Sequence, residues 1–153
     1  MTVRVQSDPF DPAAVLADVA GGDPGAGAVV SFIGRVRDSG PGGPVSRMTL
    51  EHYPGMTEQA LADIEAQARA RWELRDVQVI HRVGLMTPGE PIVLVAVASM
   101  HRGAAFSACE FIVDLLKTQA PFWKQEQTPE GTRWVEARLC DTETARRWED
   151  GEP

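Results

Sequence analysis

Two lysines, Lys117 and Lys124, are the side chains best suited to chemistry in a chain whose other basic residues are thirteen arginines. A lysine ammonium can lose its proton when it is desolvated or crowded by other cations, whereas an arginine guanidinium in practice cannot. This bias towards arginine indicates that lysine is used at positions where a guanidinium would be unsuitable. The ordinary alternative for Lys117 is a surface pair with Asp114, three residues earlier on the same helix, which stabilises a helix only slightly.

Two pairs of basic or protonatable residues could hold an anion. Arg35 and Arg37 share one face of a predicted strand, because strand side chains alternate. His101 and Arg102 open a predicted helix, where the helix dipole disfavours a cation, so a functional reason for Arg102 is favoured. Solvated cations and a hydrogen-bonded histidine remain the ordinary alternatives. From these residues alone, the sequence predicts an anion-binding pocket with one or two reactive lysines.

The remaining reactive side chains form no recognisable catalytic or metal-binding arrangement. Cys109 lies in an apolar helical stripe and is better explained as a small buried hydrophobic residue than as a nucleophile. Cys140 has no clear place, and neither cysteine has the spacing of a zinc site. His52 and His81 fall within predicted strands, and position alone does not make either catalytic. We therefore expect no metal and no bound cofactor.

Composition restricts the class of protein. The chain has 153 residues, 43% of them hydrophobic, and this suits one domain, 1–153, with a full core. The net charge of −7 and the pI near 4.9 argue against non-specific binding to nucleic acid or to a membrane surface. No run of residues approaches the length of a membrane span, and no apolar leader is evident. We expect a cytoplasmic protein with free thiols.

Helical and strand patterns are mixed without strict alternation, and this predicts the α+β class. Expected strands cover 2–6, 28–37, 46–53, 77–83, 91–98 and 132–139. Expected helices cover 12–20, capped by Asp11; 57–72, capped by Thr57; a segment from His101 that ends before Pro121; and 141–148. The third helix has a predicted buried stripe of Phe106, Cys109, Ile112, Val113 and Leu116.

Two loops could complete the pocket. The segment 38–45 is rich in glycine and proline, and is either a cover over a bound anion or a slack connection. Lys124 is expected on a loop that folds back after Pro121, anchored by Phe122 and Trp123. In that arrangement both lysines would lie near one point.

The chain closely resembles the large, catalytic subunit of molybdopterin synthase. The most specific segment is Lys-Thr-Gln-Ala-Pro-Phe-Trp-Lys at 117–124. Further matching segments are 27–37, 50–57, 80–84, 101–102, 105–106, 128–131 and 134–138. The resemblance therefore covers about residues 27–138.

The resemblance implies an α/β-hammerhead fold and a homodimer of large subunits. Each large subunit would bind one small, ubiquitin-like sulfur carrier, giving a heterotetramer. The carrier's C-terminal Gly-Gly tail would end in a thiocarboxylate and enter a pocket of the large subunit. Sulfur would pass twice to cyclic pyranopterin monophosphate and build the dithiolene of molybdopterin, as part of molybdenum cofactor biosynthesis.

The resemblance also assigns site residues. It implies that the substrate is bound by Arg35, Val36, Arg37, His101, Arg102, Lys117, Lys124, Gln125 and Glu126. It implies catalytic roles for Lys117, which faces the tip of the carrier's tail, and for Lys124. Lys117 would stabilise an oxyanion or move a proton. Gln125 stands where the resemblance leads us to expect a basic residue.

Two other functions are kept open. One is a binding module that docks the carrier but no longer turns over. The other is a sulfurtransferase that carries a persulfide on Cys109 or Cys140. Both lysines argue against the first, and replacement of both cysteines would test the second.

Overall fold

A computed structural model describes residues 3–40, 42–135, 145–146 and 148–149 of the chain. Three helices are assigned there: α1 (Pro12–Gly22), α2 (Met56–Arg71) and α3 (Arg102–Gln119). The strands are β1 (Val3–Gln6), β2 (Ala28–Arg35), β3 (Ser39–Gly40), β4 (Gly43–Pro44), β5 (Arg47–His52), β6 (Asp76–Arg82), β7 (Gly84–Met86), β8 (Pro91–Ser99), β9 (Phe122–Thr128) and β10 (Gly131–Val135). The predicted α+β class is confirmed.

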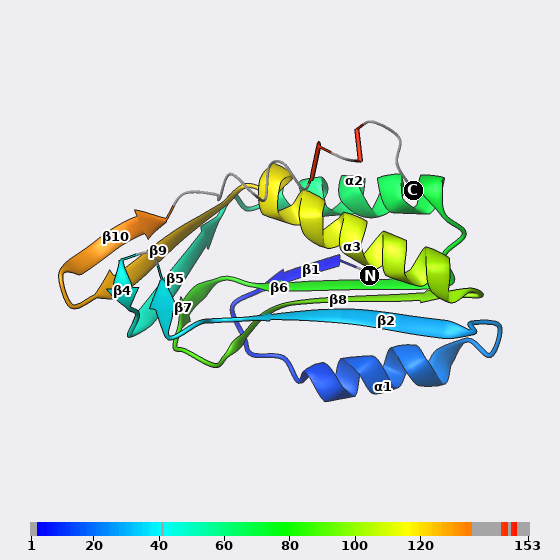
Figure 1. Cartoon of the computed structure of the whole chain (residues 1–153), viewed down its shortest axis with the longest axis horizontal. Helices are drawn as coiled ribbons and strands as arrows, with labels where there is room; N and C mark the ends of the chain where they lie inside the picture. Colours follow the sequence, from blue (N-terminus) through cyan, green and yellow to red (C-terminus); the bar gives the residue numbers. More distant parts are fainter. Residues whose placement is uncertain (1–2, 41, 136–144, 147, 150–153) are drawn as a thin grey trace.

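The main sheet has the strand order β1-β6-β8-β2 and is covered by helices on both faces (Figure 1). Strands β1 and β6 are parallel, and the other neighbours are antiparallel. Helices α2 and α3 bury one face, with Val95 and Val97 of β8 in that core. Helix α1 covers the other face over Leu94 and Ala96. The predicted apolar strand at 91–98 is confirmed, because such a run suits burial on both faces.

A second, antiparallel sheet with the order β10-β9-β5-β7 extends beyond one end of the main sheet (Figure 1). Its inner side packs in a small separate core of Val36, Met48, Leu50 and Met86. Helix α3 runs along the main sheet from the end of β8 towards this second sheet, where β9 begins. The two sheets therefore meet near the end of α3. Among the described helices, none is long and apolar enough to cross a membrane.

Local signals placed several element ends correctly. The Asp11 side chain accepts a hydrogen bond from the backbone N–H of Ala13 at 3.0 Å, and Pro12 opens α1 as predicted. Ala120, directly before Pro121, has extended backbone angles and follows the end of α3. Strand β1 is at the edge of the main sheet, as predicted.

Three predicted features of the helices and of β2 are wrong. Gly55, not Thr57, caps α2, because the positive φ of 87° there suits glycine and Thr57 is buried inside the first turn. Phe106 is 60% exposed, since α3 turns the small side chains of Ala105 and Ala108 towards the sheet and so approaches it closely. Strand β2 ends at Arg35 rather than Arg37, after an irregularity in its pairing with β8.

The predicted loops contain more structure than expected. The segment 38–45 includes the paired strands β3 and β4, so it is not a slack connection. Lys124 lies within β9, paired with β5 and β10, rather than on a loop. The strand predicted at 132–139 is seen as β10 only to Val135, and its remainder lies outside the described residues. Most of the helix predicted at 141–148 also lies outside them.

Candidate functional site

An open pocket with about 260 Å³ of empty space lies where the two sheets meet. Its lining is Arg35, Val36, Arg37, Val45, Met48, Ile92, Lys124 and Glu126. The pocket thus brings together five of the residues predicted to bind substrate, from two segments far apart in the sequence. The pocket is open to solvent, so its lining residues are accessible to a ligand.

The pocket's arginines are positioned by the end of β2. The irregular pairing between Gly34 and Arg35 marks the point where the regular ladder ends. Val36 is buried in the small core of the second sheet, while Arg35 and Arg37 on either side of it are exposed. Burial of Val36 therefore fixes the backbone between two cations that line one pocket.

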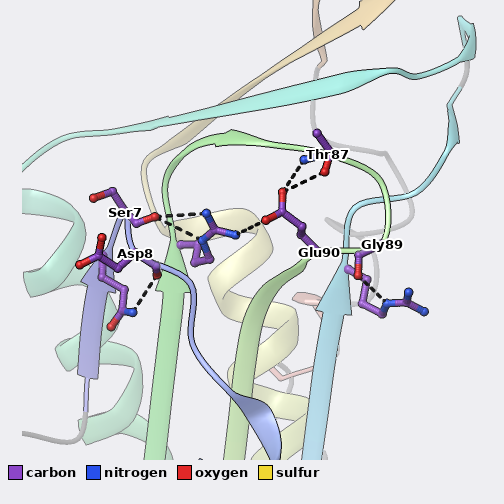
Figure 2. A network of polar contacts seen from close by, with 8 residues as sticks. Ser7, Asp8, Thr87, Gly89 and Glu90 are labelled. Carbon is purple, nitrogen blue, oxygen red and sulfur yellow. Dashed lines mark hydrogen bonds and ion pairs between the residues drawn. The ribbon is translucent and has the colours of Figure 1, made fainter.

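Backbone contacts to the turn before β8 fix the same segment. The Arg35 Nε donates to the carbonyl of Gly89 at 3.1 Å (Figure 2). The Val36 N–H donates to the carbonyl of Glu90 at 3.0 Å, and the Gly89 N–H donates to the carbonyl of Val36 at 2.8 Å. With its Nε engaged, the Arg35 guanidinium keeps its terminal Nη groups for a ligand.

Strand alternation places successive side chains of β9 on opposite sides of the sheet. Lys124 and Glu126 are two residues apart, face the same side and line the pocket. Gln125 lies between them on the opposite side and does not line it. Gln125, where the resemblance leads us to expect a basic residue, therefore lies on the other face of the sheet.

Glu126 is a buried carboxylate in a pocket of cations. Glu126 is only 6% exposed, and its Oε2 accepts no hydrogen bond from any residue that the structure describes. A Cβ added to Gly40 would lie 2.7 Å from that oxygen, so glycine allows β3 to approach. An unsatisfied buried acceptor costs about 1–3 kcal/mol, and a ligand donor would remove this cost.

Lys117 lies in the last turn of α3, exposed, near the start of β9 but not in the pocket lining. Two contacts fix the corner where α3 ends and β9 begins. The Thr57 hydroxyl donates to the carbonyl of Pro121 at 3.0 Å, and the Phe122 ring stacks on His81 with centroids 3.9 Å apart. These contacts fix the corner between Lys117 and Lys124.

His81 is a buried neutral side chain beneath this corner. Burial lowers the pKa of His81 to about 4, the hydrogen bond to the Arg82 carbonyl opposes this, and the charges of Lys117 and His52 lower it further. The carbonyl contact is 2.9 Å from Nδ1, so Nδ1 carries the proton and donates. His81 therefore contributes packing beneath this corner.

His101 and Arg102 lie at the opposite end of the main sheet from Arg35. Ser99, at the end of β8, pairs with Ala28, whereas Arg35 pairs with Pro91. Seven residues of strand at 3.3 Å each separate the two ends by roughly 23 Å. Both side chains are exposed at the start of α3. One chain therefore does not bring this pair to the pocket.

Cys109 is unsuited to carry sulfur. It is 4% exposed and its Sγ lies 3.8 Å from the carbonyl of Val95. Burial, with a smaller contribution from the charge of Glu110, raises the pKa of Cys109 to about 11. A nucleophilic cysteine needs an accessible thiolate. Cys140 lies outside the described residues.

Comparisons with known proteins identify the family of the chain. The pattern that defines the "MoaE protein" family matches residues 5–119. A molybdopterin synthase catalytic subunit from Ralstonia nicotianae is 59% identical over 147 residues, which is 96% of this chain and 84% of that protein. The matched region thus begins well before residue 27.

Solved structures share the fold. The molybdopterin biosynthesis MoaE protein from Burkholderia ambifaria is 50% identical, covers 97% of both chains and superposes with a TM-score of 0.82. A Helicobacter pylori complex of subunits 1 and 2 of molybdopterin-converting factor is similar in fold alone, at 17% identity and a TM-score of 0.73 over 90% of this chain and 92% of that one. The chain belongs to the MoaE family, the catalytic subunits of molybdopterin synthase.

Proposed function

We propose that this chain is a sulfurtransferase that builds the dithiolene of molybdopterin. Sulfur would come from the C-terminal thiocarboxylate of a small carrier subunit and pass to cyclic pyranopterin monophosphate. The observation that carries this proposal is the pocket in which Arg35, Arg37 and Lys124 converge with Glu126. A pocket of this mixed charge suits a ligand with an anionic group and a separate hydrogen-bond-donor edge.

The cations and the carboxylate would bind opposite parts of the substrate. Guanidinium and ammonium groups form strong charge-assisted hydrogen bonds to phosphate. Glu126 would repel the phosphate, but it can accept hydrogen bonds from the amino and ring N–H groups of a pterin. This would also satisfy the Oε2 atom that has no partner among the described residues.

Lys117 would act on the carrier's tail. The thiocarboxylate sulfur would bond to an oxygen-bearing carbon of the substrate as the C–O bond there breaks and the oxygen leaves as water, and the carrier would stay joined through a thioester. Water would then cleave the thioester, leaving sulfur on the substrate and a carboxylate on the carrier. Lys117 would stabilise the oxyanion that forms in this step, or move a proton. The burial of Cys109 supports sulfur delivery from outside the chain.

A second copy of the chain would complete the pocket. Strand β2 is an edge strand of the main sheet, and Val29 and Ile33 along it are exposed. A two-fold axis beside the middle of β2 would place the Ala28 end of one copy next to the Arg35 end of the other. His101 and Arg102 of each copy would then approach the other copy's pocket. The homodimer and the shared site are proposals that this geometry supports.

A carrier would find an apolar surface beside the corner that holds Lys117. Tyr53 and Trp123 are exposed and lie 5.7 Å apart between ring centroids, and Met56 is exposed nearby at the start of α2. The H. pylori complex contains two subunits of molybdopterin-converting factor, which supports a two-subunit assembly for this chain. A cytoplasmic location is proposed with it, since a free Cys109 thiol suits a reducing compartment.

The test is a mixing assay with a thiocarboxylated carrier and cyclic pyranopterin monophosphate. Molybdopterin would be measured by the fluorescence of its oxidised derivative. We expect product with the wild-type chain and with a variant in which Cys109 and Cys140 are both replaced by serine. Carrier binding without product would favour the binding-module alternative. Loss of product in the double cysteine variant would favour a persulfide mechanism.

A further inference from the structure

A buried arginine outside the pocket ties together the ends of several strands. Arg82, the last residue of β6, is 5% exposed. Its Nη2 and Nε donate to the carbonyl of Ser7 at 3.2 and 3.4 Å, and its Nη1 lies 3.2 Å from a Glu90 carboxylate oxygen (Figure 2). Ser7 follows β1 and Glu90 precedes β8. One guanidinium therefore fixes three neighbouring strands at the pocket end of the sheet.

Glu90 also holds the tight turn from Thr87 to Glu90. Its second carboxylate oxygen accepts hydrogen bonds from the backbone N–H and the hydroxyl of Thr87, at 2.6 and 3.2 Å. The Glu90 N–H in turn donates to the Thr87 carbonyl at 3.2 Å. The Thr87 N–H and the Arg82 guanidinium both lower the pKa of Glu90, as expected for a carboxylate held in its charged form.

The turn at 87–90 orients Arg35. Gly89 lies inside it and accepts the Arg35 Nε (Figure 2). Gly89 has a φ of 93°, and a Cβ added there would lie 3.4 Å from the Arg35 Nη2. The positive φ favours glycine at this position, and a Cβ there would be in ordinary van der Waals contact with the guanidinium. The orientation of Arg35 thus depends on the shape of the turn.

We propose that Arg82 and Glu90 are positioning residues for the anionic group of the substrate. Neither residue lines the pocket, so each would act through the Thr87–Glu90 turn on Arg35 and Val36. Preorganised charges bind and orient a substrate more effectively than mobile ones, and small misplacements are costly. This inference rests on the proposed function, because it assumes that Arg35 binds the substrate phosphate.

A second arginine–carboxylate pair provides a matched control. Arg75, just before β6, donates from Nε to Asp23 at 2.7 Å and from Nη2 at 3.2 Å. It lies at the opposite end of β6 from Arg82 and contacts no pocket residue named above. A pair that only supports the fold should behave like this one.

The experiment compares Arg82→Gln and Glu90→Gln with Arg75→Gln in the assembled synthase. For each we would measure KM for cyclic pyranopterin monophosphate, kcat, carrier affinity and the unfolding temperature. We expect both pocket-end variants to raise KM about tenfold, with kcat and carrier affinity close to wild type. Arg75→Gln should leave KM unchanged. Arg82→Lys should recover only part of the affinity, because an ammonium cannot reproduce the guanidinium fork between Ser7 and Glu90.

Substrate-specific readouts separate positioning from general stability. Binding of a pterin without the phosphate should be equally weak in wild type and in Glu90→Gln. If the pocket-end variants lower the unfolding temperature but keep the wild-type KM, the pair only supports the fold and the inference is wrong. Since about a third of the Glu90 side chain is exposed, Glu90→Gln should fold even if Arg82→Gln does not. Failure of the wild-type chain to convert the substrate would instead reject the proposed function.

Discussion

The two ends of the main sheet carry similar residues in very different surroundings. At one end, Arg35 and Arg37 flank a buried valine and share a pocket with Lys124, and Arg35 contacts an ordered turn. At the other end, His101 and Arg102 are exposed at the start of α3, and His101 makes no capping hydrogen bond with its side chain. The first pair is positioned by its own chain, and the second is not.

This difference teaches how a small domain can divide a site. Antiparallel pairing of β2 with β8 carries the chain away from Arg35 and begins α3 at the far end. No local rearrangement would bring His101 back across roughly 23 Å of strand. The proposed two-fold dimer would bring the two ends together without any change in fold. The predictions below test whether the two pairs act in one site that is shared between two copies of the chain.

The largest effect is expected at Lys117. This residue lies in the last turn of α3, the helix that begins beside His101 and ends near the pocket. Lys117→Ala should lower kcat by about 10²–10³-fold, the loss typical for removal of one oxyanion donor. Lys117→Arg should also be poor, because the guanidinium has a different geometry. Single-turnover assays with thiocarboxylated carrier would measure this. Near-normal turnover in Lys117→Ala with normal carrier binding would remove Lys117 from the mechanism.

The next effect tests whether the two ends meet between copies. Arg37→Ala and Arg102→Ala should each raise KM roughly 10- to 100-fold, for one lost charged hydrogen bond. Mixed dimers of the two variants would contain one intact site and one doubly altered site. After random mixing, about a quarter of the wild-type activity should return at low substrate concentration.

The control is a mixture of two variants from the same end. Arg35→Ala mixed with Arg37→Ala should recover nothing, because both residues line the same pocket of one chain. Equal recovery in both mixtures, or in neither, would contradict the proposed shared site.

A smaller, ligand-dependent effect is expected at Glu126. Wild type should prefer a pterin over the corresponding 2-oxo analogue, which lacks the amino donor, by about tenfold. Glu126→Gln should reduce this preference, because a neutral amide is a weaker acceptor. Competition binding with the two phosphorylated compounds would show it. If Glu126→Gln weakens both ligands equally, the carboxylate only balances the charges of Lys124 and the arginines.

Sequence patterns could predict the elements but not the packing between them. The Pro121 break and the buried run at 91–98 follow from local chemistry, and both were placed correctly. The strand at β9 was missed because its polar sequence lacks an apolar alternation, and pairing with β5 and β10 decided its structure.

The same limit applies to the site. The scarcity of lysine singled out Lys117 and Lys124, strand alternation placed Arg35 and Arg37 on one face, and the resemblance added Glu126. Nothing local indicated that β2 ends at Arg35. The contact between the turn at 87–90 and Arg35 spans 54 residues and has no signature in sequence. Such contacts depend on strand order, which the pattern of residues does not determine.

The last prediction concerns stability at the pocket end, and leaves kcat at neutral pH unchanged. His81 is buried beneath Phe122 with its pKa lowered to about 4 from an ordinary value of 6.5. Between these two values the unfolded chain binds a proton at this position that the folded chain does not. Folding stability should therefore fall as pH decreases through this window, by up to about 3 kcal/mol.

Urea unfolding at several pH values between 7 and 4 would measure this loss in the wild type and in His81→Phe. Phenylalanine can retain an aromatic contact with Phe122 but cannot take up a proton. The lowered pKa values of Asp23 and Glu90 also cost stability in acid, but at lower pH and in both proteins alike. The difference between the two proteins therefore isolates His81: the unfolding free energy of the wild type minus that of His81→Phe should decrease as pH falls from 6.5. A difference independent of pH would mean that His81 is protonated without penalty, and that the corner holding Lys117 and Lys124 is open to water.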